Sequence, residues 1–116
     1  MAIIYHITSN ADWAAAQAAG VYTADSLESE GFIHCSKPGQ VVATANRYYK
    51  GVAGLVLLAI APARVHAEIR LENTSGGTEL FPHIYGPLNL DAVSAALPFP
   101  PGADGSFSLP ANAPAG

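Results

Sequence analysis

Hydrophobic and polar positions alternate along several short stretches of this chain, a pattern typical of β-strands that bury one face. The alternation is clearest at residues 2–8, where odd-numbered positions would face one side and even-numbered positions the other. Residues 55–60 are continuously apolar, which favours a central strand buried on both faces. A second clear strand pattern occupies 31–36, and another strand is expected at 67–71. Residues 91–97 are Ala-rich like a helix, but the segment is short and Pro98 closes it, so a strand is favoured over a helix. The segment 80–85 is expected to be short and irregular because Pro82 would block a central ladder position.

Helical signals occur twice. Ser9 or Asn10 can cap an Ala-rich helix that ends at Gly20. Pro38 fits the first turn of a second helix, which Gly51 would end. Because two helices come early and several strands follow, the pattern predicts an α+β domain.

The remaining segments carry weaker signals. Residues 21–30 are expected to form a short extended piece and one helical turn, and 107–109 to dock as an extended strand. We expect one domain over 1–110, followed by a disordered tail rich in Pro, Ala and Gly at 111–116.

Composition and charge limit the classes of function that the chain can have. The chain has 116 residues, with 5 Lys plus Arg and 9 Asp plus Glu, a formal charge of −4 that argues against a protein that coats nucleic acid. A small nucleotide remains a possible ligand, because two or three local donors can hold it. The single Cys35 excludes an internal disulfide. Without a signal-peptide pattern or an apolar run long enough to span a bilayer, we expect a cytoplasmic monomer with no membrane contact.

Three of the four histidines lie in short apolar segments and have a hydroxyl side chain two residues further on. In a strand, such residues point to the same face. The pairs are His6 with Thr8, His34 with Ser36, and His83 with Tyr85. Since only 12% of residues are charged, such groups are scarce, and we interpret the three pairs as the lining of one polar pocket. The alternative is that each histidine is a core residue satisfied by a neighbour.

The chemistry of these groups favours binding of a small ligand. Imidazoles and hydroxyls suit sugar hydroxyls, carboxamides or phosphates, tyrosines offer stacking surfaces, and Arg47 could reach a phosphate. Cys35 would face away from His34, into the core, where a thiol is inert. Three histidines could also hold zinc for a metal-assisted hydrolase. We expect no metal, because the three segments contain no Asp or Glu to support zinc ligands.

Several segments together are similar to one bacterial family, domain of unknown function 952. They are YHIT at 5–8, GFIHCS at 31–36, TANRYY at 44–49, LVLL at 55–58 and FPHIYGPL at 81–88. The resemblance covers about residues 3–110. The family has no established biochemical role, and it is grouped with the ADP-ribosyltransferase-like fold. The order of motifs also resembles the catalytic core of the RNA 2′-phosphotransferases that consume NAD.

This resemblance implies a small ADP-ribosyltransferase-like domain, with two N-terminal helices packed on a split, strongly bent β-sheet. It implies that His6 would hydrogen-bond the ribose or carboxamide of NAD, and that His34 and Ser36 would line its nicotinamide or phosphate side. The chain departs from the pattern where ADP-ribosyltransferases carry a Glu on a late strand, because His83 and Tyr85 stand there instead.

The sequence therefore predicts a pocket that binds a nucleotide-like or sugar-phosphate ligand, with NAD or ADP-ribose as the compounds it would act on. Its candidate catalytic residues are His34 and His83. Its candidate binding residues are His6, Thr8, Ser36, Arg47 and Tyr85. A non-catalytic ligand-sensing module on the same fold is the alternative.

Overall fold

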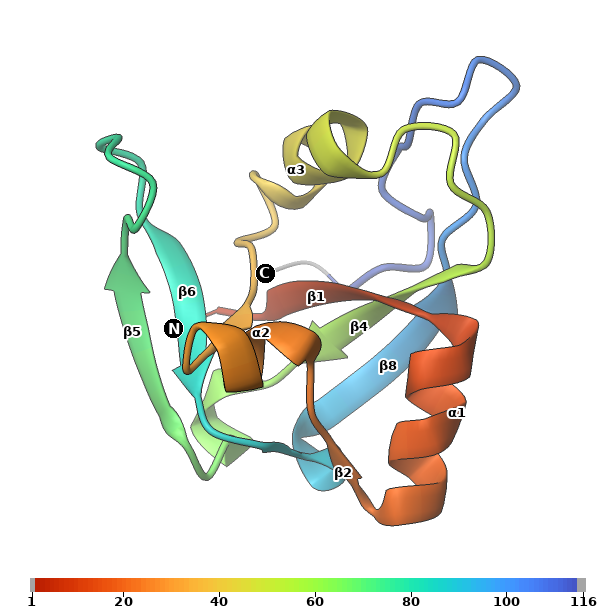
Figure 1. Ribbon diagram of the computed structural model, residues 1–116. Coiled ribbons are helices and arrows are strands. Elements are labelled where there is room, and N and C mark those ends of the chain that lie inside the picture. The colour runs from red at the N-terminus through yellow and green to blue at the C-terminus, as the bar shows by residue number, and fades with distance from the viewer. Residues whose placement is uncertain (1, 115–116) are drawn as a thin grey trace.

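Two small antiparallel sheets meet at the N-terminal strand in the computed structural model, which describes residues 2–114 (Figure 1). In the first sheet, β1 (Ile4–Ser9) pairs along its whole length with β4 (Leu55–Ile60), and β8 (Val93–Pro98) lies on the other side of β4. In the second sheet, the central β6 (Phe81–Tyr85) lies between β3 (Ile33–His34) and β5 (Glu68–Glu72).

An isolated bridge between Tyr5 and Ser36 joins the two sheets. The backbone N–H of each residue donates to the carbonyl of the other, at 2.8 Å in both directions. A two-residue pair, β2 (Val21–Tyr22) with β7 (Leu88–Asn89), completes the strands. The molecule is a small α+β fold with antiparallel sheets.

Three helices pack on this framework. The sequence predicted two helices and, within residues 21–30, one further helical turn. They are α1 (Asn10–Ala19), α2 (Asp25–Ser29) and α3 (Val41–Tyr48), with short 3-10 turns at Pro62–Arg64 and Leu90–Ala92. The predicted caps of α1 are confirmed: Ser9 Oγ accepts the Asp12 N–H at 3.0 Å, and Gly20 takes a left-handed conformation with φ 82°.

The predicted start of α3 is wrong. Pro38 lies in a turn that precedes the helix, and α3 begins at Val41. The Gln40 N–H donates to the Lys37 carbonyl at 2.9 Å, and the Lys37 N–H donates to the Gln40 side chain at 2.9 Å. These bonds close a turn around Pro38, so the helix starts only after Gln40.

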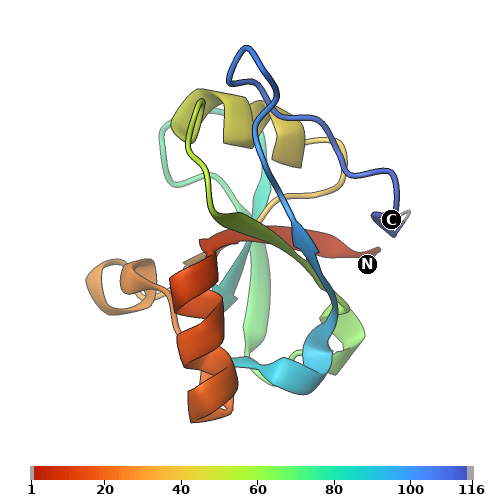
Figure 2. The same cartoon turned by 90° about the vertical axis from the view of Figure 1, so that its right-hand side faces the viewer.

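The core lies on both faces of the first sheet, so β4 is buried on both sides as predicted. Helix α1 lies on one face and α3 on the other (Figure 2). Alternate β4 residues enter the two clusters: Val56, Leu58 and Ile60 on the α1 side, and Leu55, Leu57 and Ala59 on the α3 side.

Pro82 lies in β6, the central strand of its sheet, so the expectation that it would block such a position is wrong. Its carbonyl accepts the Cys35 N–H at 3.0 Å. In an antiparallel ladder, the N and C=O of one residue point to the same neighbour. The missing N–H of Pro82 therefore faces Cys35, just past His34, where the pairing of β3 already ends.

The C-terminal segment covers the α3 side of the core. Phe107 is buried against Phe99, and its N–H donates to Asn46 Oδ1 at 2.7 Å. The strand predicted at 107–109 does not form. The Tyr5 hydroxyl donates to the Pro114 carbonyl at 2.5 Å. Of the tail predicted to be disordered, 111–114 lie within the described residues, whereas 115 and 116 lie outside them. No helix within 2–114 has the length and apolar character needed to cross a membrane.

Replacement of Leu57 by Ala tests the packing of β4. Leu57 is fully buried, so Leu57→Ala should lower the free energy of unfolding by about 2–5 kcal/mol in urea melts. Leu109→Ala is the matched control, because that side chain is 40% exposed and should change stability little. A near-neutral Leu57→Ala would contradict the assignment of β4 to the core.

Candidate functional site

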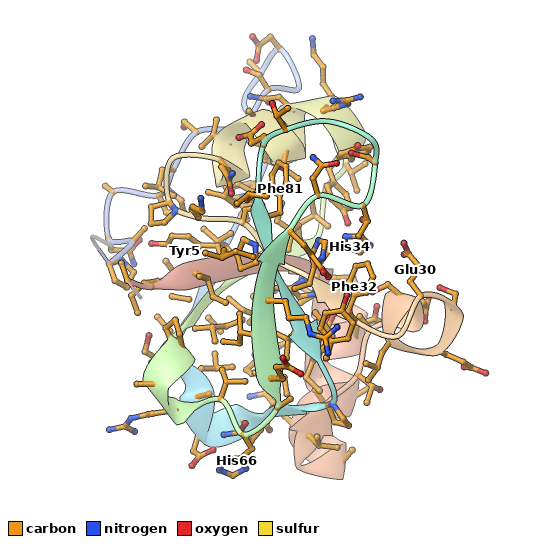
Figure 3. All side chains as sticks on the ribbon, turned by 90° about the vertical axis from the view of Figure 1, so that its left-hand side faces the viewer. Tyr5, Glu30, Phe32, His34, His66 and Phe81 are labelled. Atoms are coloured by element: carbon orange, nitrogen blue, oxygen red, sulfur yellow. The ribbon has the colours of Figure 1, made fainter. Side chains whose placement is uncertain are left out.

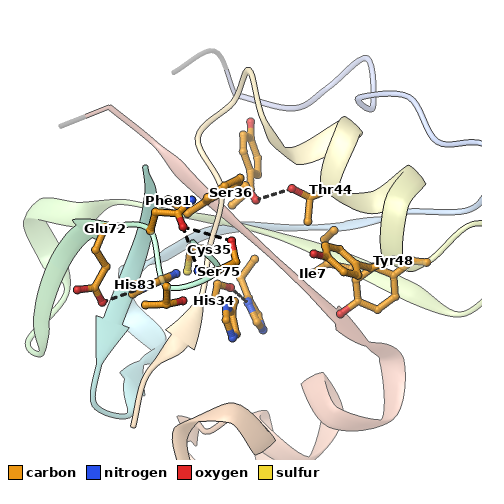
Figure 4. Close-up of a pocket in the computed structure, with 15 residues that line it drawn as sticks. Ile7, His34, Cys35, Ser36, Thr44, Tyr48, Glu72, Ser75, Phe81 and His83 are labelled. Carbon is orange, nitrogen blue, oxygen red and sulfur yellow. Dashed lines mark hydrogen bonds and ion pairs between the residues drawn. The ribbon is translucent and has the colours of Figure 1, made fainter. Parts of the chain in front are cut away.

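A cavity of about 490 Å³, here called the seam pocket, lies where the two sheets meet (Figure 4). Residues from β1, from the 34–36 segment, from α3 and from the β5–β6 hairpin line it. Three of the four histidines contribute to this lining: His6, His34 and His83. The structure thus brings together the histidines that the sequence singled out, although each has a different environment.

His83 is held by a carboxylate that lies outside every motif considered in the sequence. Its Nδ1 lies 3.0 Å from Glu72 Oε1, and the Tyr85 hydroxyl donates to the same oxygen. These two hydrogen bonds, from Tyr85 and then from His83, lower the pKa of Glu72. The ring of Phe32 stacks on that of His83, with centroids 4.1 Å apart. His83 and Tyr85 therefore share a face as predicted, and Glu72 joins them.

His34 is the accessible histidine of the pocket. Its side chain is 50% exposed, and its Nε2 lies 2.9 Å from Glu30 Oε2 in the preceding turn. Its ring lies edge-on to that of His83, with centroids 5.2 Å apart. Figure 3 shows His34, Phe32 and Glu30 on one side of the molecule, away from His66. An imidazole in this position can contact a ligand without any rearrangement of the core.

His6 serves a different purpose, because both of its ring nitrogens are already bonded. Nδ1 lies 2.5 Å from the His34 carbonyl, and Nε2 lies 2.6 Å from the Tyr22 hydroxyl. Burial lowers the pKa of His6 to about 4, so the ring is neutral at pH 7. A carbonyl only accepts hydrogen bonds, so Nδ1 carries the proton and Nε2 accepts from Tyr22. The imidazole ties β1 to β2 and β3.

Thr8 belongs to the same buried network. Its Oγ1 lies 3.0 Å from the Tyr22 hydroxyl, and it does not line the seam pocket. Burial raises the pKa of Tyr22 to about 12, so the phenol stays protonated. The predicted same-face pair of His6 and Thr8 is present, but Tyr22 uses its hydrogen-bonding atoms. The sequence pattern does not indicate this contact of Tyr22 with His6 and Thr8.

The α3 side of the seam pocket supplies hydroxyls and aromatic rings. The Ser36 hydroxyl donates to Thr44 Oγ1 at 3.4 Å. Tyr49 packs against the core, whereas Tyr48 is 67% exposed at the pocket. Arg47 does not line the cavity; it is exposed, and its guanidinium lies 5.4 Å from the centroid of the Tyr48 ring.

Cys35 is buried, as the sequence predicted, and His66 does not line the seam pocket. Cys35 is buried in the apolar cluster, and burial raises the pKa of its thiol far above the ordinary value. His66 is exposed at the far end of the β5–β6 hairpin from Glu72. Within 2–114, no group of three or more His, Cys, Asp or Glu side chains is placed to hold a metal ion.

Tertiary contacts revise one argument made from the sequence. The histidine segments lack Asp and Glu, yet His34 and His83 each meet a carboxylate from elsewhere in the chain, Glu30 and Glu72. The register of β5 on β6 is the signal that would identify Glu72 as a neighbour of His83. In β5, Arg70 lies opposite His83, so Glu72, two residues on, is a diagonal neighbour on the same face.

Comparisons with known proteins identify relatives of the whole fold. A family model described as "Protein of unknown function (DUF952)" matches residues 7–96. The crystal structure of CC0527 from Caulobacter crescentus is 36% identical, with a TM-score of 0.83 over 92% of this chain and 94% of that one. The solution NMR structure of CC0527 gives 36% identity and a TM-score of 0.80, over 91% of each chain. No curated protein matches the chain.

The buried His6 should make stability depend on pH. Its folded pKa of about 4 lies below the ordinary histidine value of 6.5, so the unfolded chain binds the proton first as the pH falls. The contribution of a neutral His6 is therefore complete above pH 6.5 and is lost between pH 6.5 and 4, in total on the order of 3 kcal/mol.

Urea melts of the wild type and of His6→Gln between pH 7.5 and 4 would measure this loss. The difference in unfolding free energy should change with pH at up to about 1.4 kcal/mol per unit, because the variant has no imidazole at this position. A difference that stays constant over this range would show that His6 is not buried in its neutral form.

Proposed function

We propose that this chain, which belongs to the DUF952 family, binds a small nucleotide-like or sugar-phosphate ligand in the seam pocket. The observation that carries the proposal is an exposed aromatic ring, Tyr48, that faces a wall of hydroxyls and histidines across one cavity. The cavity volume of about 490 Å³ lies within the range of about 300–1,000 Å³ usual for small-molecule sites.

The aromatic side fits a base. Tyr48 leaves 67% of its surface exposed, although burial would stabilise an aromatic side chain. A flat nucleobase stacked on the ring would cover this surface. Arg47, beside the same ring, extends the binding surface beyond the cavity and is placed for a phosphate at its rim.

The opposite side fits sugar and phosphate oxygens. Ser36 and Ser75 bring hydroxyls, and His34 brings an exposed imidazole. Among the described residues, no Lys or Arg lines the cavity, and Glu72 adds a negative charge. This balance favours a ligand with few charges inside the cavity, such as a ribosyl group or a single phosphate.

NAD and ADP-ribose remain the first ligands to test, because the motifs resemble those of the ADP-ribosyltransferase-like fold. In this proposal His34 and Ser36 contact the ligand, as that resemblance implies. His6 and Thr8 position the wall behind it, since Tyr22 and the His34 carbonyl use their polar atoms. Tyr85 acts through Glu72.

Calorimetric titration with NAD, ADP-ribose and AMP tests the proposal. We expect at least one of these compounds to bind, and Tyr48→Ala to weaken its binding roughly tenfold through lost stacking, about 1.4 kcal/mol. Val52→Ala serves as control, because Val52 is exposed and does not line the cavity. Absence of binding by all three compounds, or equal affinity in Tyr48→Ala, would contradict the proposed site.

A further inference from the structure

We propose that the seam pocket is catalytic and hydrolyses a phosphodiester bond of its ligand, with His83 as general base and His34 as general acid. This inference rests on the ligand class proposed above. It goes beyond binding because the two imidazoles are arranged to move protons in opposite directions.

Glu72 fixes the tautomer of His83. An ionised carboxylate can only accept hydrogen bonds, and Glu72 Oε1 lies 3.0 Å from Nδ1 of His83. Nδ1 therefore carries the proton, and the lone pair is on Nε2. Within residues 2–114, Nε2 makes no hydrogen bond. In Figure 4, His83 lies between Glu72 and the middle of the pocket.

The imidazole of His83 is held rigidly by its neighbours. Phe32 stacks on the ring with an angle of 17° between the planes, and His83 is only 3% exposed. Glu72 is itself held by the Tyr85 hydroxyl, and the guanidinium of Arg70 lies 4.3 Å from the centroid of the Tyr85 ring. A base that is fixed before the ligand arrives loses little entropy in the reaction. Glu72 is thus a positioning residue.

The neighbouring His34 is the proposed general acid. Its ring centroid is 5.2 Å from that of His83, and its Nε2 is paired with Glu30. Glu30 holds the ring through Nε2, and Nδ1 of His34 has no hydrogen-bond partner within 2–114. Because His34 is half exposed, it can regain a proton from solvent after each turnover.

The reaction uses water as its second reactant. His83 Nε2 takes a proton from water as the water oxygen forms a bond to phosphorus. The bond from phosphorus to the leaving oxygen breaks, that oxygen keeps the electron pair, and it receives a proton from the His34 imidazolium. The products are a phosphomonoester and an alcohol, and proton exchange with solvent restores both imidazoles.

The charges of the pocket select the diester. A phosphodiester carries one negative charge, whereas a phosphomonoester carries nearly two at pH 7. Within residues 2–114, no Lys or Arg lines the cavity to offset the second charge, and Glu72 opposes it. The monoester product therefore fits less well than the substrate, which favours its release.

Hydrolysis of adenosine 2′,3′-cyclic phosphate and of bis(4-nitrophenyl) phosphate by the purified chain tests the inference. We expect turnover with a bell-shaped pH profile, since one histidine must be neutral and the other protonated. His83→Gln and His34→Gln should each lower kcat about 100-fold or more, with a smaller change in KM. Glu72→Gln should lower kcat and also shift one limb of the pH profile, which a purely structural role would not do.

His66→Gln is the matched control, because His66 is exposed and lies outside the pocket. It should retain wild-type turnover. If His83→Gln fails to fold by circular dichroism, the half-exposed His34→Gln decides. Tyr48-dependent binding of a nucleotide without hydrolysis of either probe would overturn the catalytic inference and leave the proposed function standing. Turnover that survives in His34→Gln would also overturn the catalytic inference. If the wild-type chain binds none of NAD, ADP-ribose and AMP, the proposed function itself is wrong.

Discussion

The hydrogen bonds that fasten β1 to the segment 34–36 determine how the rest of the molecule is arranged. Tyr5 and Ser36 exchange two backbone bonds of 2.8 Å, and the His6 ring reaches the His34 carbonyl beside them. Since the other edge of β1 is paired with β4, this contact joins the first sheet to the second through backbone hydrogen bonds. The seam pocket lies at that junction, so the same bonds that join the sheets also shape its wall.

Three histidines in similar sequence contexts acquire different roles through burial and partners. His6 is buried, with both nitrogens bonded, and serves the framework. His83 is buried too, but among the described residues only its Nδ1 is bonded, which leaves Nε2 for the proposed proton transfer. His34 is half exposed beside a carboxylate. Strand alternation places these residues on particular faces, whereas the partner of each nitrogen determines its function.

The sequence predicted the features that depend on neighbours along the chain. Alternation located β1, a continuous apolar run located β4, and Ser9 with Gly20 delimited α1. Prediction failed where a partner distant in sequence decides the outcome. A proline is tolerated in a central strand because its partner strand has ended, and Glu72 meets His83 only through the register of β5 on β6. Tyr22 likewise joins His6 and Thr8 through tertiary packing, which local spacing does not reveal.

The central claim is that hydrogen-bond partners, rather than sequence context, fix the form of each histidine. Two-dimensional NMR that correlates the ring nitrogens with the ring carbon-bound protons reports the tautomer of each imidazole directly. At neutral pH, His6 and His83 should both appear as the Nδ1-protonated tautomer, because the His34 carbonyl and Glu72 accept from Nδ1. Signals of the Nε2-protonated tautomer for either residue would contradict the account of the seam pocket.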